Sequence, residues 1–344
     1  KLRGELDLQG SKNSALPIMA AAYLCRGECI LHNCPKLTDI YAASRILNYI
    51  GCKCSFADNT AVITSAQSGH TAIPEELMQE MRSSIIFLGA LLGKNKTGTV
   101  SYPGGCELGS RPIDMHLSSF RKMGVDIKEK FGRITCSVRK SIHGAKISLP
   151  FPSVGATENI MLCAVLAEGE TVINNAAREP EIKDLADFLR CCGAKIKGDG
   201  ESSIVIEGVK ELHGCEYTVM SDRIAGATYL AAAASAGGEI IIHKACVGCM
   251  EPFISLLDQT GCSIYTIDDG IYLRSGLRLK AVRDCIRTMP HPGFPTDAQA
   301  ILMAALIKAD GTSVFEENIF DCRYRHTDAL VKMGADITVL GKTA

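Results

Sequence analysis

A loop rich in glycine and proline carries the residues of this sequence that are best suited to chemistry. Residues 101–114 read SYPGGCELGSRPID, and the glycines and prolines exclude a continuous helix or strand. Cys106 stands in the middle of the loop, and Arg111 follows it. Because a nearby cation makes a thiol more acidic, Cys106 is a candidate thiolate or general acid. The alternative is a surface turn with an incidental cysteine.

Polar side chains also stand at equivalent places in five predicted helices. Counted back from the glycine that follows each helix, they lie 14 to 16 residues away, and they are Lys12, Arg82, Ser153, Arg223 and Asp297. Ser221 and Thr296 fit helix N-caps. Cations oppose the helix dipole, so Lys12, Arg82 and Arg223 indicate a bound anion, and we expect a phosphate-bearing substrate.

Asp297 is the candidate acid or base of this set. It ends the segment PHPGFPTD at residues 290–297, whose three prolines are expected to hold the carboxylate in place. Glu179 and Glu181, on either side of Pro180, fit first-turn helix charges.

These residues sit on a repeated pattern of elements. Small-residue apolar helices are predicted at residues 15–27, 84–98, 156–169, 224–238 and 298–311, each closed by glycine and followed by a strand. Amphipathic helices that also end in glycine are predicted at residues 39–51, 113–124, 181–193, 251–261 and 327–334, and strands such as 125–127 and 335–337 follow them. Both series have a period of about 70 residues, which predicts an α/β protein of repeated units.

Composition narrows the functional class. The 344 residues are 47% hydrophobic and 22% charged, and the net charge of -1 disfavours nucleic acid and acidic membranes as partners. No apolar run of 18 residues and no signal pattern occurs, so we expect a cytoplasmic protein. The 16 cysteines are then expected to be reduced.

No metal site or cofactor is expected from the cysteine spacing. The pairs Cys52/Cys54 and Cys191/Cys192 have the wrong spacing for half of a zinc site. Cys246 and Cys249 have C-x-x-C spacing, but no second such pair or histidine pair follows, so we interpret them as structural or incidental.

Six motifs together resemble the UDP-N-acetylglucosamine 1-carboxyvinyltransferases, a family of enolpyruvyl transferases. They are SKNSALP at residues 11–17, MRSS at 81–84, the loop at 101–114, SVGAT at 153–157, AREPE at 177–181 and PHPGFPTD at 290–297. The resemblance covers essentially the whole chain, in order. It implies two inside-out α/β domains of three repeats each, with the active site in the cleft between them.

The resemblance implies that the first domain spans residues 13–221. The second then combines residues 1–12 with 222–344 and holds two of three repeats, so the sixth repeat, with its late arginine, is expected to be missing. The implied reaction is enolpyruvyl transfer from phosphoenolpyruvate to the 3′-hydroxyl of UDP-N-acetylglucosamine, the first committed step of peptidoglycan synthesis.

The resemblance also implies residue roles. Lys12, Asn13, Arg82 and Arg111 match phosphoenolpyruvate ligands. Cys106 matches the thiol that acts as general acid or forms an adduct, and that fosfomycin alkylates. Asp297 matches the residue paired with the 3′-hydroxyl, and Arg323 a further arginine. The positions that match the lining of the UDP-sugar site are Arg111, Pro112, Ile113, Asp114, Met115, Ser153, Val154, Gly155, Ile319 and Phe320.

One departure and three alternatives remain. The family commonly has a lysine where this chain has Phe151, so a cation near the diphosphate is missing. 5-Enolpyruvylshikimate 3-phosphate synthase shares the fold but lacks a loop cysteine, and its glycine-asparagine-alanine-glycine-threonine run is not found here. A non-catalytic UDP-sugar-binding protein or an inactive fragment of this family is also open, whereas the charge disfavours a relative of RNA 3′-phosphate cyclases.

Overall fold

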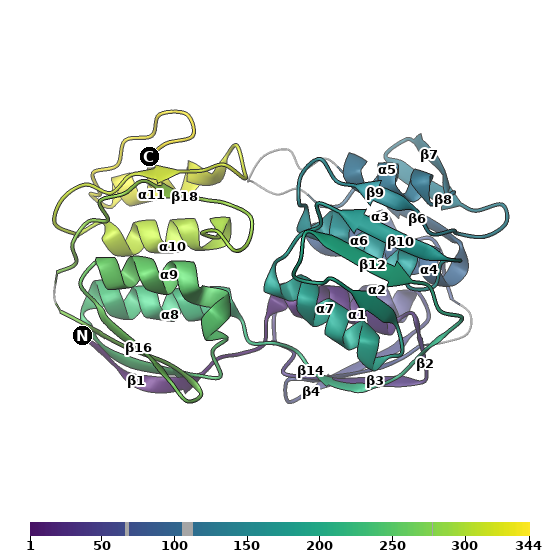
Figure 1. Ribbon diagram of the computed structural model, residues 1–344, viewed down its shortest axis with the longest axis horizontal. Coiled ribbons are helices and arrows are strands. Elements are labelled where there is room, and N and C mark those ends of the chain that lie inside the picture. The colour runs from purple at the N-terminus through teal and green to yellow at the C-terminus, as the bar shows by residue number, and fades with distance from the viewer. Residues whose placement is uncertain (66–68, 105–112, 277) are drawn as a thin grey trace. The chain divides into compact units, whose positions relative to one another are not determined.

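The structure is a computed structural model that describes residues 1–65, 69–104, 113–276 and 278–344 (Figure 1). These residues form two units. The N-terminal unit comprises the described residues between 10 and 220, and the C-terminal unit comprises residues 1–9 and the described residues from 221 to 344.

The N-terminal unit contains three copies of one pattern: helix, strand, helix and β-hairpin. The first copy consists of α1 (Lys12–Ala22), β3 (Glu28–His32), α2 (Thr38–Tyr49), β4 (Lys53–Ala57) and β5 (Thr60–Thr64). The second consists of α4 (Ile86–Asn95), β6 (Thr97–Ser101), α5 (Asp114–Lys122), β7 (Asp126–Lys130) and β8 (Arg133–Ser137). The third consists of α6 (Val154–Ala164), β10 (Glu170–Asn174), α7 (Pro180–Cys191), β11 (Lys195–Lys197) and β12 (Ser203–Glu207).

Each copy builds one sheet. The strand orders are β14-β3-β5-β4, β6-β8-β7 and β11-β12-β10-β9. The remaining elements of the unit are β2 (Cys25–Arg26), α3 (Glu75–Gln79), η1 (Arg82–Ile85), β9 (Lys146–Ser148), β13 (Leu212–His213) and β14 (Glu216–Thr218). β14 pairs in parallel with β3, and β13 with β2, so the end of the unit joins its beginning.

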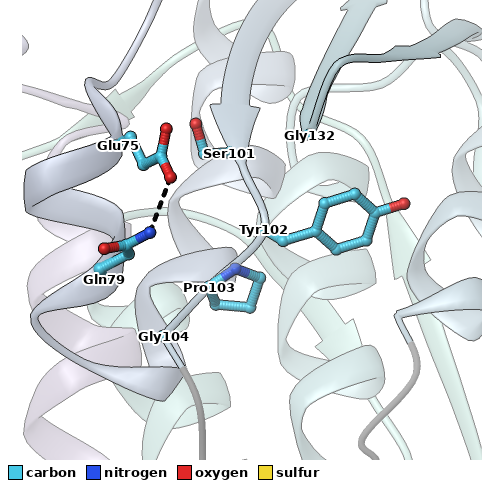
Figure 2. A pocket seen from close by; sticks show the side chains of 7 residues that line it. All are labelled: Glu75, Gln79, Ser101, Tyr102, Pro103, Gly104 and Gly132. Atoms are coloured by element: carbon cyan, nitrogen blue, oxygen red, sulfur yellow. Dashed lines mark hydrogen bonds between the residues drawn. The ribbon is translucent and has the colours of Figure 1, made fainter.

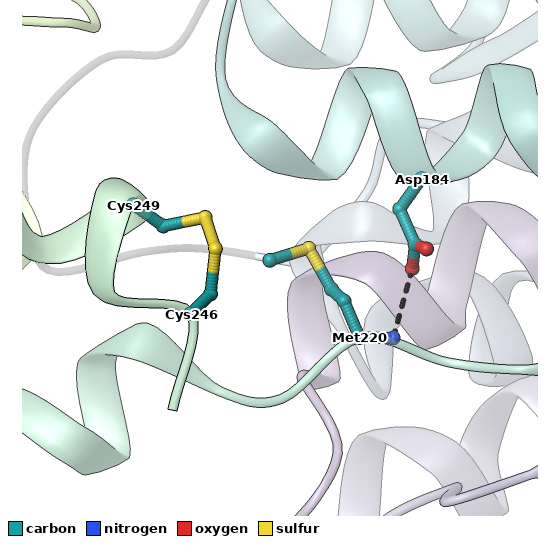
Figure 3. The surroundings of a disulfide bond; sticks show 4 residues. All are labelled: Asp184, Met220, Cys246 and Cys249. Atoms are coloured by element: carbon teal, nitrogen blue, oxygen red, sulfur yellow. Dashed lines mark hydrogen bonds between the residues drawn. A yellow bond between two sulfur atoms is a disulfide. The ribbon is translucent and has the colours of Figure 1, made fainter. Parts of the chain in front are cut away.

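Asp184 of α7 stabilises this closure. Its carboxylate accepts hydrogen bonds from the Ser14 hydroxyl, from the Tyr217 hydroxyl at 2.6 Å and from the backbone N–H of Met220 at 3.1 Å. Figure 3 shows the bond to Met220. Burial raises the pKa of Asp184, while these donors act against that shift.

The C-terminal unit repeats the same pattern around the sheet β1-β15-β17-β16. It contains β1 (Leu2–Asp7), α8 (Arg223–Ala236), β15 (Gly238–His243), α9 (Val247–Gln259), β16 (Ser263–Ile267), β17 (Gly270–Ser275), β18 (Ile286–Arg287), α10 (Thr296–Leu306), β19 (Phe315–Glu316), η2 (Arg323–Arg325) and α11 (His326–Lys332). The N-terminal strand β1 pairs in parallel with β15. In Figure 1, α8 and α9 cover one face of this sheet.

The first helix of each copy in the N-terminal unit lies in the core. α1, α4 and α6 are buried over nearly their whole length, which explains their apolar, small-residue sequences. α4 and α6 pack closely at Gly89, where a Cβ atom would stand 2.3 Å from the carbonyl oxygen of Asn159. Glycine is therefore required at this crossing.

The predicted repeats and ten predicted helices are confirmed, but some details are wrong. The glycines after the second helices, such as Gly51 and Gly124, do end them with positive φ. Gly98 and Gly238 instead lie in β6 and β15, and left-handed Lys96 ends α4. Residues 335–337 form no strand, because no hairpin partner follows them in residues 338–344.

One disulfide corrects the expectation that every cysteine is reduced. Cys246, at the start of α9, is bonded to Cys249 in the first turn, with their Cα atoms 5.3 Å apart (Figure 3). The other 13 described cysteines are free. Among the described residues, none of the helices is both long and apolar enough to cross a membrane.

Candidate functional site

The stem of the glycine-rich loop leaves β6 at Ser101. Cys106, Arg111 and Pro112 lie outside the described residues. The stem borders a cavity of about 370 Å³, lined by Glu75, Gln79, Ser101, Tyr102, Pro103, Gly104 and Gly132 (Figure 2). The first four residues of the loop thus form part of the cavity wall.

Gly104 fixes the path of this stem. Its N–H donates to the carbonyl of Met78 at 3.2 Å, and a Cβ atom here would lie 2.3 Å from the carbonyl oxygen of Gln79. Tyr102 donates its hydroxyl to Glu129 at 2.7 Å. The stem, residues 101–104 of the loop, is therefore fastened to α3 and to β7.

Lys12 and Asn13 are the first two residues of α1, and both are half-buried. Ser11 caps the helix by accepting a bond from the N–H of Ser14 at 3.3 Å. The Lys12 ammonium lies 3.1 Å from the Asp39 carboxylate of α2. The Asp39 carboxylate is thus one anion near Lys12, and it belongs to the protein itself.

Arg82 begins η1, and His116 of α5 lies within its electrostatic reach. His116 is 6% exposed, and its Nδ1 is 2.8 Å from the side-chain nitrogen of Asn159. The Asn159 oxygen accepts from the N–H of Gly89, so its nitrogen must donate to His116. The imidazole proton is therefore on Nε2.

This Nε2 faces the start of α6. A Cβ atom on Gly155 would lie 3.5 Å from Cε1 and 3.8 Å from Nε2 of His116. Burial, followed by the positive charge of Arg82, lowers the pKa of His116 to about 4. At neutral pH the ring is therefore an uncharged donor beside the SVGAT turn.

In the N-terminal unit, the other described residues predicted to line a UDP-sugar site occupy two helix starts. Ile113 is buried before α5, Asp114 is its exposed first residue and Met115 is half-buried. Ser153 caps α6 through a bond from the N–H of Ala156 at 3.3 Å, and Val154 begins that helix. Phe151 is exposed nearby.

The carboxylates of the AREPE motif are not simply solvated helix charges. Glu181 is in the first turn of α7 as predicted, but it is only 2% exposed. Glu158 of α6 is also buried. Burial, and then the negative charges of Glu181 and Glu179, raise the pKa of Glu158 well above its usual value.

In the C-terminal unit, Asp297 is held by an arginine. Arg323 Nη2 donates to Asp297 Oδ1 at 3.0 Å and to the carbonyl of Thr296 at 3.0 Å. The side chain of Arg323 is 12% exposed and that of Asp297 is 38% exposed. The carboxylate is therefore fixed yet accessible, as an acceptor of a substrate proton must be.

Ile319 and Phe320 are held against the same helix start by Glu317. This carboxylate is 1% exposed and accepts from the N–H groups of Ile319 at 2.9 Å and Phe320 at 3.0 Å, and from the Thr296 hydroxyl. The Arg323 guanidinium lies 5.7 Å from the centre of the Phe320 ring. Asp297, Ile319, Phe320 and Arg323 thus form one cluster.

Two predicted caps are wrong. Asp222, not Ser221, caps α8, because its carboxylate reaches the N–H groups of Ile224 and Ala225. Thr296 is the first residue of α10 and uses its hydroxyl on Glu317. Arg223 is the buried first residue of α8.

Each unit therefore brings together part of the predicted residue set. The helix starts that carry Arg82, Asp114 and Gly155 meet around His116 in the N-terminal unit. His116, Asn159 and Glu317 were not predicted. Only the position of His116, beside Met115, offered a signal in the sequence.

Comparison with known proteins gives one family. Residues 1–344 match the sequence model of the family described as EPSP synthase (3-phosphoshikimate 1-carboxyvinyltransferase). A relative from Caldanaerobacter subterraneus subsp. tengcongensis, named UDP-N-acetylglucosamine 1-carboxyvinyltransferase 2, is 50% identical over 344 residues, which are all of this chain and 82% of the relative. UDP-N-acetylglucosamine 1-carboxyvinyltransferase 1 of Carboxydothermus hydrogenoformans is 43% identical over 100% of this chain and 81% of its own length.

Solved structures agree on the fold. The enolpyruvyl transferase NikO from Streptomyces tendae matches with a TM-score of 0.87 at 20% identity, covering 100% of this chain and 81% of its own. EPSP synthase from Acinetobacter baumannii matches with a TM-score of 0.70 at 21% identity, covering 91% and 73%. The α/β architecture is thus that of these enzymes.

Proposed function

Because the chain belongs to the EPSP synthase (3-phosphoshikimate 1-carboxyvinyltransferase) family, we propose that it transfers the enolpyruvyl group of phosphoenolpyruvate to the 3′-hydroxyl of UDP-N-acetylglucosamine. Phosphate is the second product, and the reaction is the first committed step of peptidoglycan synthesis. The observation that carries the proposal is the 50% identity, over the whole chain, to a relative named for this activity. We place the reaction in the cytoplasm.

The proposed chemistry is addition followed by elimination. The 3′-oxygen forms a bond to C2 of phosphoenolpyruvate and loses its proton to Asp297, while C3 gains a proton from Cys106. C3 then returns a proton to the Cys106 thiolate as the bond from C2 to the phosphate oxygen breaks, which restores the double bond. The leaving phosphate takes the proton held by Asp297. Cys106 has a second option, a covalent adduct with phosphoenolpyruvate, and it is the proposed point of attack of fosfomycin.

In this proposal three cations and one amide bind the anionic donor. Lys12, Asn13, Arg82 and Arg111 are assigned to phosphoenolpyruvate. The place of Lys12 at the first residue of the 11-residue helix α1 supports this, because helix N–H groups and an ammonium both attract phosphate. The bond to Asp39 holds the ammonium at that helix start.

The residues proposed for the UDP-sugar are assigned by matching motif, and each assignment is supported within its own unit. The neutral His116 supports a sugar-nucleotide site near Asp114 and Gly155, because its Nε2–H can donate a hydrogen bond while the ring carries no charge. Asp297 is assigned to the 3′-hydroxyl, and its bond to Arg323 supports this by fixing one carboxylate oxygen. Ile319 and Phe320 are assigned to the apolar side of the same site.

A second acceptor must be tested, since the family description names 3-phosphoshikimate. Phosphate release from phosphoenolpyruvate is measured with the 344-residue chain and either UDP-N-acetylglucosamine or 3-phosphoshikimate. We expect release with the first acceptor alone, and its loss in Cys106→Ala. Release only with 3-phosphoshikimate would overturn the proposal. Binding of UDP-N-acetylglucosamine without any release would favour a non-catalytic protein.

A further inference from the structure

Four cysteines from separate parts of the sequence meet in the N-terminal unit. Cys25 lies in β2, Cys29 in β3, Cys192 at the C-cap of α7 and Cys215 just before β14. The sulfur atoms of Cys25, Cys29 and Cys192 all lie within 4.8 Å of one another. The sulfur of Cys215 lies 3.4 Å from that of Cys192. We call these four residues the thiol cluster.

Backbone pairing holds the thiol cluster in place. Cys25 is paired with Leu212 in the parallel register of β2 and β13. The N–H of Ile30 donates to the carbonyl of Cys215 at 2.9 Å, and the N–H of His213 donates to that of Cys192 at 3.0 Å. The four Cα positions are therefore set by strand pairing and by the end of a helix.

The thiol cluster differs from a surface group of cysteines because most of it is buried. Cys29 and Cys192 are 0% exposed and Cys25 is 1% exposed, while Cys215 is half-buried. Among the described residues, no other group of three or more His, Cys, Asp or Glu side chains brings its ligand atoms this close. Cys215 is the one partly exposed member of the thiol cluster.

We propose that the thiol cluster binds one zinc ion through Cys25, Cys29, Cys192 and Cys215. Zinc bound by four thiolates is tetrahedral with bonds of about 2.3 Å, which places the sulfurs about 3.8 Å apart. The separations of up to 4.8 Å among the sulfurs of Cys25, Cys29 and Cys192, and of 3.4 Å between those of Cys192 and Cys215, bracket this spacing. The spacing C-x-x-x-C of Cys25 and Cys29 is also that of a zinc-binding pair.

Other metal groups fit less well. An iron–sulfur cluster needs space for its inorganic atoms between the thiolates, whereas three sulfurs within 4.8 Å leave space for a single ion. Soft thiolate ligands also exclude magnesium and calcium, which prefer oxygen. On binding, each thiol gives its proton to solvent as its bond to zinc forms, so no oxidant or reductant is needed.

The role of the ion would be structural. It would join the end of α7 to the two strand pairs through which the end of the unit meets its beginning. No ligand position is left open for substrate, which is typical of a structural zinc site. None of its four ligands is a residue to which the enolpyruvyl reaction is assigned.

The test uses Co²⁺ as a coloured substitute for zinc. The full chain is purified, stripped with a chelator and reductant under anaerobic conditions, and titrated with Co²⁺. We expect a thiolate-to-cobalt charge-transfer band that saturates at about one equivalent and disappears when zinc is added. Zinc should also raise the melting temperature of the stripped protein.

Cys192→Ala tests the ligand set, and Cys163→Ala is the matched control. Cys163 is a fully buried thiol of α6 that lies outside the thiol cluster. We expect the band and the zinc-induced stabilisation to be lost in Cys192→Ala and kept in Cys163→Ala. If Cys192→Ala does not fold, the half-buried Cys215→Ala takes its place and should weaken both signals.

Three results would overturn the proposal. The first is a folded, reduced wild-type chain that shows no charge-transfer band. The second is a band that persists unchanged in the folded cluster variant, which would place the ion on other thiols. The third is formation of a disulfide within the thiol cluster upon mild oxidation with no zinc uptake by the reduced form, which would make it a redox pair instead.

Discussion

The side-chain nitrogen of Asn159 lies 2.8 Å from Nδ1 of His116, and both residues are buried. The same nitrogen donates to the carbonyl of Ile85 at 2.9 Å, and the Asn159 oxygen accepts from the N–H of Gly89 at 2.7 Å. One amide therefore joins the helix starts that carry Arg82 and Gly155 to the imidazole between them.

We expect Asn159→Leu to destabilise the fold by about 3 kcal/mol or more, because it leaves three buried polar groups without a partner. The measurement is the free energy of unfolding in urea. Asn48→Leu is the control. Asn48 is exposed on α2, so water can replace its bonds to the backbone of Cys54, and the change should cost less than about 1 kcal/mol. Equal effects of the two changes would contradict the network.

The pKa of His116 predicts an acid-sensitive contribution to stability. Its folded value is about 4 against 6.5 for the free side chain, so between these values the unfolded chain binds a proton that the folded chain does not. Stability from this group is thus complete above pH 6.5 and is lost as pH falls toward 4, by up to about 3 kcal/mol.

His116→Gln tests this pH dependence. The stability of the wild type relative to His116→Gln should fall between pH 7 and pH 4. A wild-type advantage over His116→Gln that is the same at both pH values would show that the ring is not held neutral.

Lys12→Gln should separate activity from stability. The Lys12 side chain is 40% exposed, so its ion pair with Asp39 contributes about 1 kcal/mol at most. If Lys12 binds phosphoenolpyruvate, its loss should raise KM for that substrate about 10-fold or more. Lys53→Gln, on the edge strand β4, is the matched control and should change neither quantity. A wild-type KM in Lys12→Gln would remove Lys12 from the site.

Arg323→Lys tests whether this arginine positions Asp297. Lysine keeps the charge but cannot reproduce the two bonds from one guanidinium group to Asp297 and to the carbonyl of Thr296. We expect kcat to fall about 10-fold while KM for UDP-N-acetylglucosamine changes little. Arg325→Lys, an exposed change in the same turn, is the control. A rise in KM with kcat unchanged would indicate a binding role instead.

Periodicity made much of the fold predictable. The helix starts at Lys12, Arg82, Ser153, Arg223 and Asp297 follow from repeated apolar helices and glycine stops, which are local signals. The strand at residues 335–337 was wrong because a strand is stable only with a partner, and the pattern of one segment does not report whether a partner exists.

The contacts that these helix starts make with distant parts of the chain could not be predicted from local sequence patterns. The contact of His116 with Asn159 depends on how α5 packs on α6, and the role of Glu317 depends on three donors that turn toward it in space. Of the thiol cluster, only Cys25 and Cys29 lie close together in the sequence. Its other two cysteines reach it only through strand pairing between the two ends of the unit.

The most direct measurement is the mass of the sugar nucleotide after UDP-N-acetylglucosamine and phosphoenolpyruvate are incubated with the 344-residue chain. We expect a gain of one enolpyruvyl group, at a rate that falls about 100-fold or more in Asp297→Asn and stays unchanged in the exposed control Asp328→Asn. An unmodified sugar nucleotide after incubation with the folded wild-type chain would contradict the proposed transferase. Equal product from the wild type and Asp297→Asn would contradict the role of Asp297.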